Sequence, residues 1–234
     1  MMENTLSKSR VIKLASQAAL VLGLAVGSGL ASAVPVVWDL GCAASPPCQN
    51  TAYASPHTFQ SIGPAPNPFA LITYGYNADN TAHQLFSKFT SGDLTETGLG
   101  LAGVPDNEIN AGQKIQLKVP FSALYHLVVS SVQQGEIFSI FRNNAAGGDG
   151  AGSIAGAALF ANQTFNTGAC AGAICTYDID MTGFTSLTVL GVAGDVLIET
   201  FTTTANIILV PEPMTLALLG IGLLAAGVGR RRKV

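Results

Sequence analysis

The chain has 234 residues, of which 48% are hydrophobic and 11% charged, and its formal net charge is −3. This charge-poor composition excludes disorder as the general state and requires a folded core, membrane segments or both. Between Val34 and Val210, four cationic and twelve acidic side chains give a net charge of −8. That charge excludes nucleic-acid binding, because no basic stripe is available to contact phosphates.

The N-terminal segment contains the three parts of a secretory signal peptide. Basic residues occur within 1–13, residues 14–30 carry no charge, and an Ala31-Ser32-Ala33 site follows. Small residues at Ala31 and Ala33 are typical of the cleavage site of such a peptide. We therefore predict a signal peptide over residues 1–33, cut after Ala33, with an uncleaved N-terminal membrane anchor as the alternative.

Four cysteines lie in the part of the chain that would be exported: Cys42, Cys48, Cys170 and Cys175. Exported cysteines are usually paired as disulfides, and three pairings are open to four cysteines. We favour Cys42–Cys48 and Cys170–Cys175, because each pair brackets a short loop. A zinc site is disfavoured, because the sequence has no Cys-x-x-Cys and no histidine near either pair.

The middle of the chain is rich in short β-branched and aromatic segments. The segments with the strongest pattern are 69–76, 114–119, 136–141, 186–190 and 196–202. In 114–119, Ile115, Leu117 and Val119 alternate with Gln116 and Lys118, which predicts a strand with one buried face. Turn residues separate these segments at 77–80, at 143–144 and at 193–195, where the turn predicts a hairpin.

No amphipathic stretch in this region is long enough for a substantial helix. Short strands without intervening helical periods are typical of antiparallel sheets packed face to face. We predict an all-β fold, an antiparallel β-sandwich of the jelly-roll kind, over residues 34–209. In this prediction the signal peptide precedes the sandwich, and a C-terminal transmembrane helix follows it.

The C-terminal segment 210–234 has three consecutive features. Pro211-Glu212-Pro213 is followed by the uncharged run 214–229 and then by the cluster Arg230-Arg231-Arg232-Lys233. A helix of sixteen residues reaches about 24 Å, so it spans a bilayer core of about 30 Å only with snorkelling of its basic end. The positive charges predict that this end stays in the cytoplasm and that the body lies beyond the inner membrane.

This tail resembles the PEP-CTERM sorting signal of exopolysaccharide-producing Gram-negative bacteria. The resemblance includes Pro211, Glu212 and Pro213, the apolar helix, and Arg230, Arg231 and Arg232 in the same order. It implies recognition by exosortase, a membrane-embedded enzyme that removes the helix after the secretion machinery has exported the chain. The alternative is a permanent tail anchor that is not processed.

A second resemblance covers 97–103, 106–110 and the strand from Lys114. A Gly-Leu-Gly stretch, an acidic turn and an alternating strand are similar to those of many exported PEP-CTERM proteins. In this chain Asn110 stands where an Asp is common. The resemblance implies a β-sandwich and does not imply an enzyme.

Candidate ligand and catalytic residues are few. Asp106, Glu108 and Asn110 could offer oxygen atoms to Ca²⁺, although the pattern lacks the glycine and the bidentate glutamate of an EF-hand, so an ordinary acidic turn is the competing interpretation. Asp178 and Asp180 form a similar acidic pair, and an exposed face of a strand is favoured over a cation site for them. A Gly-x-Gly-x-x-Gly spacing from Gly98 is not followed by a helix, which argues against nucleotide binding. We predict no cofactor.

The sequence predicts a non-enzymatic protein of the cell envelope or extracellular matrix, structural or adhesive in an exopolysaccharide or biofilm context. Two alternatives remain open. Paired acids could hydrolyse glycosides, and exposed aromatic side chains could bind the exopolysaccharide as a carbohydrate-binding module. The aromatic candidates are Trp38, Tyr53, Phe59, Phe69, Tyr74 and Tyr76. The expected partners are exosortase, the secretion machinery, the inner membrane and exopolysaccharide.

Overall fold

The computed structural model describes residues 32–41, 49–62, 69–91, 93–103, 106–121, 123–144, 154 and 158–207. Val34–Ala205 form one compact unit. Within the described ranges the only helix is the short 3₁₀ helix η2 (Leu94–Glu96), so no described helix has the length needed to cross a membrane.

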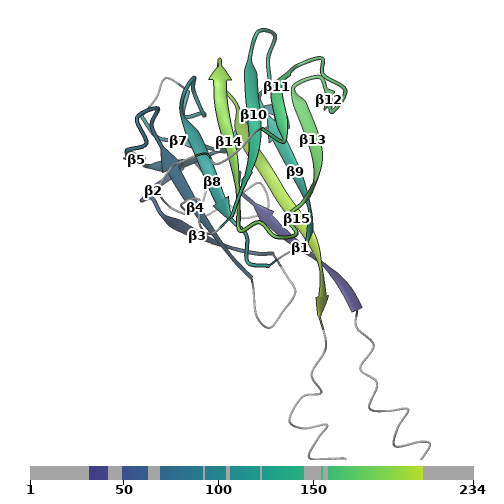
Figure 1. The fold of residues 1–234 in the computed structure, drawn as a ribbon. Coiled ribbons are helices and arrows are strands. Elements are labelled where there is room, and N and C mark those ends of the chain that lie inside the picture. The colour runs from purple at the N-terminus through teal and green to yellow at the C-terminus, as the bar shows by residue number, and fades with distance from the viewer. Residues whose placement is uncertain are drawn as a thin grey trace, which may run out of the picture. The chain divides into compact units, whose positions relative to one another are not determined.

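Two antiparallel sheets make up this unit (Figure 1). The eight-stranded sheet has the order β12 (Cys170–Ala171), β13 (Ile174–Asp180), β9 (Leu124–Ser130), β15 (Leu197–Ile207), β7 (Gly98–Leu101), β6 (Leu85–Lys88) and β2 (Thr51–Tyr53), with β1 (Ser32–Asp39) also paired to β15. The seven-stranded sheet has the order β11 (Phe160–Thr164), β10 (Ile137–Asn143), β14 (Ser186–Ala193), β8 (Lys114–Lys118), β4 (Ala70–Tyr76) and β3 (His57–Gln60), with β5 (Ala82–His83) paired to β4.

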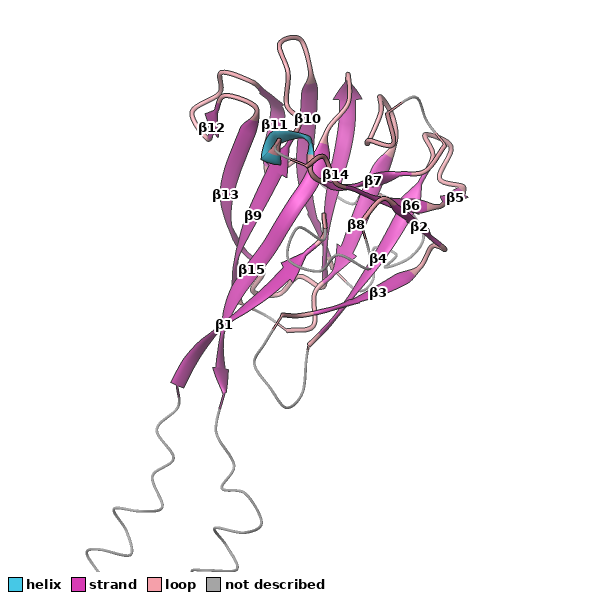
Figure 2. Ribbon diagram, turned by 180° about the vertical axis from the view of Figure 1, so that it is seen from behind, coloured by secondary structure: helices cyan, strands magenta, loops and turns pink. Residues whose placement is uncertain are grey.

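The two sheets pack face to face (Figure 2), and buried apolar and aromatic side chains form the core. Phe138 of β10 meets Tyr177 of β13 edge to face, with ring centroids 6.0 Å apart. Strand β8 behaves as its alternating sequence predicts, because Ile115 and Leu117 are fully buried. The predicted all-β antiparallel β-sandwich is confirmed.

The outer face of the seven-stranded sheet differs from the expectation of a solvated face. Gln116 points away from the core, yet only 1% of it is exposed. Its amide donates to Thr188 Oγ1 at 3.4 Å, and Asn143 donates to the same atom at 2.9 Å. Asn143 is the last residue of β10, paired with Ser186 of β14, and so lies outside the turn predicted at 143–144.

Two predicted turns have different outcomes. Residues 77–80 form a turn between β4 and β5, with Asn80 in the left-handed region at φ 67°. The hairpin predicted at 193–195 is wrong, because β14 and β15 lie in different sheets. Both edges of β14 are already occupied by β8 and β10, so the turn at Gly194 carries the chain across to the other sheet.

The strands nearest the two chain ends are hydrogen-bonded neighbours. Strand β1 pairs with β15, and Leu40 N donates to Glu199 O at 3.1 Å just beyond the end of β1. Both strands leave the sandwich at the same end (Figure 1). Ala33, the predicted cleavage residue, lies in β1.

Candidate functional site

The most buried cluster of charged side chains in the described residues surrounds Lys88. Its ammonium binds Glu96 Oε2 at 2.8 Å and also donates to Glu108 Oε1. Only 3% of the Glu108 side chain is exposed, against 26% for Glu96 and 19% for Lys88. Ser131 Oγ donates to the remaining oxygen of Glu96 at 3.1 Å. We call Lys88, Glu96 and Glu108 the charge cluster.

Three separate parts of the chain supply the charge cluster. Lys88 ends β6, where Leu85 and Ser87 point into the core and Lys88 points away from it. Glu96 ends η2, whose first turn is capped by the Asp93 carboxylate accepting from Thr95 N at 3.0 Å. Glu108 belongs to the segment between β7 and β8. The cluster therefore ties this segment and η2 to the end of a strand.

The segment that carries Glu108 lies directly against β7, and glycine makes this approach possible. A Cβ atom added at Gly100 would lie 2.1 Å from Asn107 O and 2.7 Å from Glu108 Cα. The neighbouring Ile109 is fully buried and pairs with Val196. Glycine within a strand often marks a place where another backbone comes close. The Gly-Leu-Gly sequence of β7 therefore allows the acidic turn to pack directly against the strand.

Replacing Gly100 with alanine is expected to lower the free energy of unfolding by about 1–3 kcal/mol, because the new methyl group must displace backbone atoms rather than a flexible side chain. Gly168 is the matched control, since a Cβ there meets nothing within 4 Å. Gly168→Ala should change stability by less than about 0.5 kcal/mol. Urea unfolding of both variants measures the difference, and equal stability would show that the segment does not rest on β7.

Burial and pairing have opposite effects on the ionisation of the charge cluster. Burial raises the pKa of Glu108 to about 7, although Lys88 opposes this shift. Burial also acts to lower the pKa of Lys88, but the hydrogen bonds and charges of Glu108 and Glu96 outweigh it and raise that pKa overall. The ammonium is therefore a permanent cation held between two carboxyl groups, an arrangement suited to holding segments together.

The wild-type domain is expected to lose stability as the pH rises from about 4.5 to about 7. Over that window folded Glu108 retains a proton that the unfolded chain has released, so the unfolding free energy falls with pH. A carboxyl pKa of about 7 in place of 4.5 corresponds to a loss on the order of 3 kcal/mol. Thermal unfolding across this range should show the decline, and Glu108→Gln should flatten it; an identical slope in that variant would contradict the assignment.

The calcium candidates either have other partners or lie at the surface. Glu108 is bound to Lys88, Asp106 is exposed, and the Asn110 side-chain amide donates to Glu108 O at 3.4 Å. In the described part of the chain, no three His, Cys, Asp or Glu side chains gather as metal ligands would. Of the acidic turn, Glu108 belongs to the charge cluster.

A shallow hollow of about 280 Å³ lies on the outer face of the eight-stranded sheet, near the end where β1 and β15 leave. Its lining is Pro35, Val37, Leu124, Tyr125, His126, Asp178, Thr202, Thr203 and Thr204. His126 Nδ1 and Asp178 Oδ1 are 2.8 Å apart, and both side chains are largely exposed. As predicted, Asp178 and Asp180 lie on one exposed face of β13.

The predicted aromatic set divides between the core and the surface. Trp38 is fully buried, and Phe59 and Tyr76 are at least nine-tenths buried. Tyr53, Phe69 and Tyr74 are partly exposed. Tyr53 of β2 stacks on His57 of β3 with ring centroids 4.1 Å apart, so these two rings join the edges of the two sheets.

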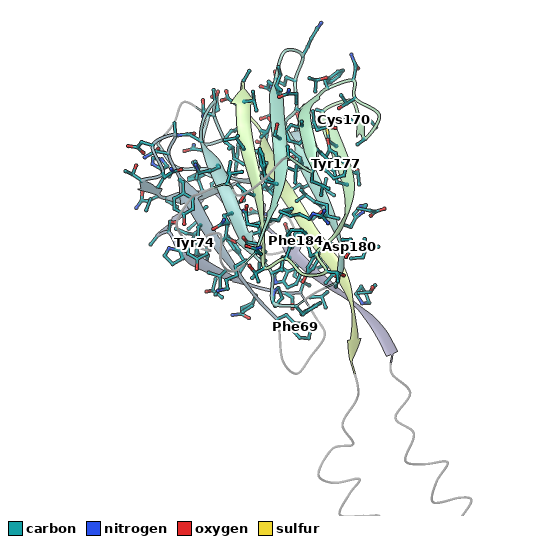
Figure 3. All side chains as sticks on the ribbon, in the orientation of Figure 1. Phe69, Tyr74, Cys170, Tyr177, Asp180 and Phe184 are labelled. Atoms are coloured by element: carbon teal, nitrogen blue, oxygen red, sulfur yellow. A yellow bond between two sulfur atoms is a disulfide. The ribbon has the colours of Figure 1, made fainter. Side chains whose placement is uncertain are left out.

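One of the two predicted disulfides falls within the described residues and is confirmed. Cys170 and Cys175 lie opposite each other in the β12–β13 pair and are joined by a disulfide, with Cα atoms 3.9 Å apart (Figure 3). Cys42 and Cys48 lie outside the described residues. So do Ala31 and the sorting residues Pro211, Glu212, Pro213, Arg230, Arg231 and Arg232.

Comparison with known proteins identifies the C-terminal segment. The family model of the PEP-CTERM protein-sorting motif matches residues 209–233. The chain carries a PEP-CTERM sorting motif. This motif indicates an exported protein that is sorted by exosortase in the cell envelope. The assignment made from the Pro-Glu-Pro tripeptide, the apolar run and the arginine cluster is thereby confirmed.

The other comparisons add little. No curated protein sequence matches this chain. A solved structure described as "The complexity of the Ruminococcus flavefaciens cellulosome reflects an expansion in glycan recognition" is 10% identical, and the match covers 75% of this chain and 97% of that one. Its TM-score of 0.28 supports no inference about shared architecture or ligand.

Sequence reasoning did not identify Lys88 and Glu96 as partners of Glu108. The three residues are separated by 8 and 12 positions along the chain, and no periodic pattern relates them. The alternate glycines at Gly98 and Gly100 were the available signal, because glycine within a strand often marks a place where another segment approaches the backbone.

Proposed function

We propose that this PEP-CTERM protein is a non-enzymatic component of the cell envelope or extracellular matrix, structural or adhesive in an exopolysaccharide context. The observation that carries the proposal is the sorting motif at 209–233, which follows closely on the last strand of a β-sandwich. A disulfide-bonded antiparallel sandwich suits a protein that works outside the cytoplasm.

The charge cluster favours this proposal over a secreted hydrolase. A glycosidase requires two carboxyl groups that face a bound sugar, one to protonate the leaving group and one to act as nucleophile or base. Glu96 and Glu108 lie close together, yet both are bound to the Lys88 ammonium. Their geometry supports a role in holding the fold.

The proposal is tested by complementing cells that lack the protein. Wild-type chain should restore matrix cohesion, whereas a chain truncated before Pro211 should be exported without restoring it. Glu96→Gln separates the two classes of function: rescue equal to wild type agrees with a structural role, and loss of rescue in a correctly folded variant would favour hydrolysis. Intact mass of the protein outside the cell reports processing, and a mass that retains 214–234 would contradict removal of the tail.

Carbohydrate binding is a second candidate, favoured by the partly exposed Tyr53–His57 pair at the joined sheet edges. Aromatic faces of this kind stack well on sugar rings. Tyr53→Ala should abolish retention of the purified domain on the cell's own exopolysaccharide, while Tyr74→Ala, on a different face, should not. Equal retention of both variants would remove this candidate.

A further inference from the structure

The exposed apolar side chains of the described residues are concentrated at one end of the sandwich. Leu124 is 60% exposed and Ile62 is 46% exposed. Both lie beside the paired terminal strands: Ile62 forms a bridge with Val37 of β1, and the Leu124 carbonyl accepts from Thr203 Oγ1 of β15 at 2.7 Å. The third exposed large apolar residue, Val192, lies near the opposite end of β14.

Partly exposed aromatic rings occur at the same end. Phe69 and Phe121 meet edge to face with ring centroids 5.3 Å apart. Arg142 lies over the ring of Phe184, with Cζ 4.3 Å from the ring centroid. Figure 3 shows Phe69 and Phe184 at the end where β1 and β15 leave the sandwich. Phenylalanine rings beside cationic side chains also occur on protein elements that lie in the interfacial region of a bilayer.

The length of the chain beyond β15 restricts what this end can approach. Strand β15 ends at Ile207, and the apolar run of the sorting motif begins at Met214. The seven Cα–Cα steps from 207 to 214 span at most about 25 Å even when fully extended. While 214–229 is inserted in a membrane, this end of the sandwich therefore remains within that distance of the lipid surface. Because the tether is short, the effective concentration of this surface at the membrane is high, and even a weak apolar contact with lipid is favoured.

We propose that this end of the sandwich, bearing Leu124, Ile62 and the hollow beside β1, rests on the lipid surface until the sorting motif is cut. The inference depends on the proposed function, because it requires the motif to hold the chain at the membrane. The opposite end, with Val192 and the charge cluster, then points away from the bilayer. Cutting the motif removes the tether, and the apolar end separates from the lipid.

The test uses the full chain reconstituted in phosphatidylcholine vesicles, with a fluorescent label on single introduced cysteines. Leu124→Cys and Ile62→Cys report the proposed surface, and Val192→Cys is the matched control at the opposite end. Ala225→Cys, within the apolar run, reports insertion of the motif. Quenching is measured with brominated acyl chains and with aqueous iodide, against wild-type chain carried through the same labelling to subtract reaction of the native cysteines.

The expected result is at least twofold stronger quenching by brominated lipid for labels at 124 and 62 than at 192, with iodide showing the reverse order. Equal iodide access at all three positions, with the label at 225 inserted, would overturn the lipid contact and leave the anchoring intact. A label at 225 that iodide reaches freely would overturn both. Shielding at 124 that appears only after adding the processing enzyme would assign this surface to a protein partner and overturn the proposal.

Discussion

Replacing Lys88 with methionine is expected to lower the free energy of unfolding by about 3–5 kcal/mol at a pH of about 8.5. Removing one partner of a buried ion pair leaves the other charge without compensation. Glu108, of which 3% is exposed, would then either stay charged in a site that water hardly reaches or take up a proton against the pH of the solution, and both cost stability. Urea unfolding at this pH measures the loss directly.

The pH dependence of the Lys88→Met defect is a second readout of the same cause. Burial already raises the pKa of Glu108 to about 7 with Lys88 present, and without that cation the carboxyl should hold its proton to still higher pH. The cost should therefore shrink as the solution becomes acidic, because a neutral carboxyl tolerates burial better than a charged one. A defect that stays constant from about pH 5 to 8.5 would show that lost packing, not charge, is responsible.

Two further variants compare the stability loss at the buried Lys88–Glu108 pair with the loss at an exposed contact and with an apolar replacement of the pair. His126→Gln removes the hydrogen-bonded contact between His126 and Asp178, in which both side chains are exposed, and it should cost less than about 1 kcal/mol. Lys88→Met combined with Glu108→Leu replaces the buried charges with apolar groups and should recover much of the stability. A Lys88→Met loss no larger than that of His126→Gln would contradict the buried character of the cluster.

The sequence alone predicts a strand wherever the alternation of that segment's own apolar and polar side chains is enough to identify it. The alternation of Ile115 and Leu117 with Gln116 marks a strand whatever its neighbours are. Sheet membership is a different matter, because the turn around Gly194 joins two sheets although its sequence favours a hairpin. A tight turn that contains glycine can join two strands of a hairpin or two strands of different sheets. Here β8 and β10 occupy both edges of β14, so β15 cannot pair with it.

The candidate site was less predictable for the same reason. The sequence offered Glu108 only as a weak calcium candidate, because acidic residues at alternate positions offer oxygen atoms, with an ordinary acidic turn as the competing interpretation. Its true neighbour, Lys88, lies 20 residues earlier, and the contact exists only once the segment rests on Gly100. Trp38 was a candidate for sugar binding, yet composition alone does not separate core aromatics from surface ones. Its alternation with Val36 and Leu40, both fully buried, is the pattern that indicates a core position.

Replacing Trp38 with alanine is expected to cost about 3–5 kcal/mol of unfolding free energy, as for other large buried aromatics. The Trp38 ring is fully buried between Tyr125, at 6.3 Å, and Phe201, at 6.0 Å between ring centroids. Its Nε1 donates to Phe69 O at 2.9 Å, a bond that alanine also removes. Trp38→Phe retains most of the apolar contact and should lose less, which calorimetry of the two variants would show.

The Trp38 substitution should also act locally, because this side chain fixes β1 to the core. If β1 detaches, the C-terminal half of β15 loses a hydrogen-bonded neighbour. That part of β15, which leads into the sorting motif, then has an unpaired edge. Hydrogen exchange should therefore accelerate in β1 and over 200–207 of β15 before it accelerates in β8 and β14. Uniform acceleration throughout both sheets would contradict this view, because it would make β1 part of one cooperative unit and not a separately attached strand.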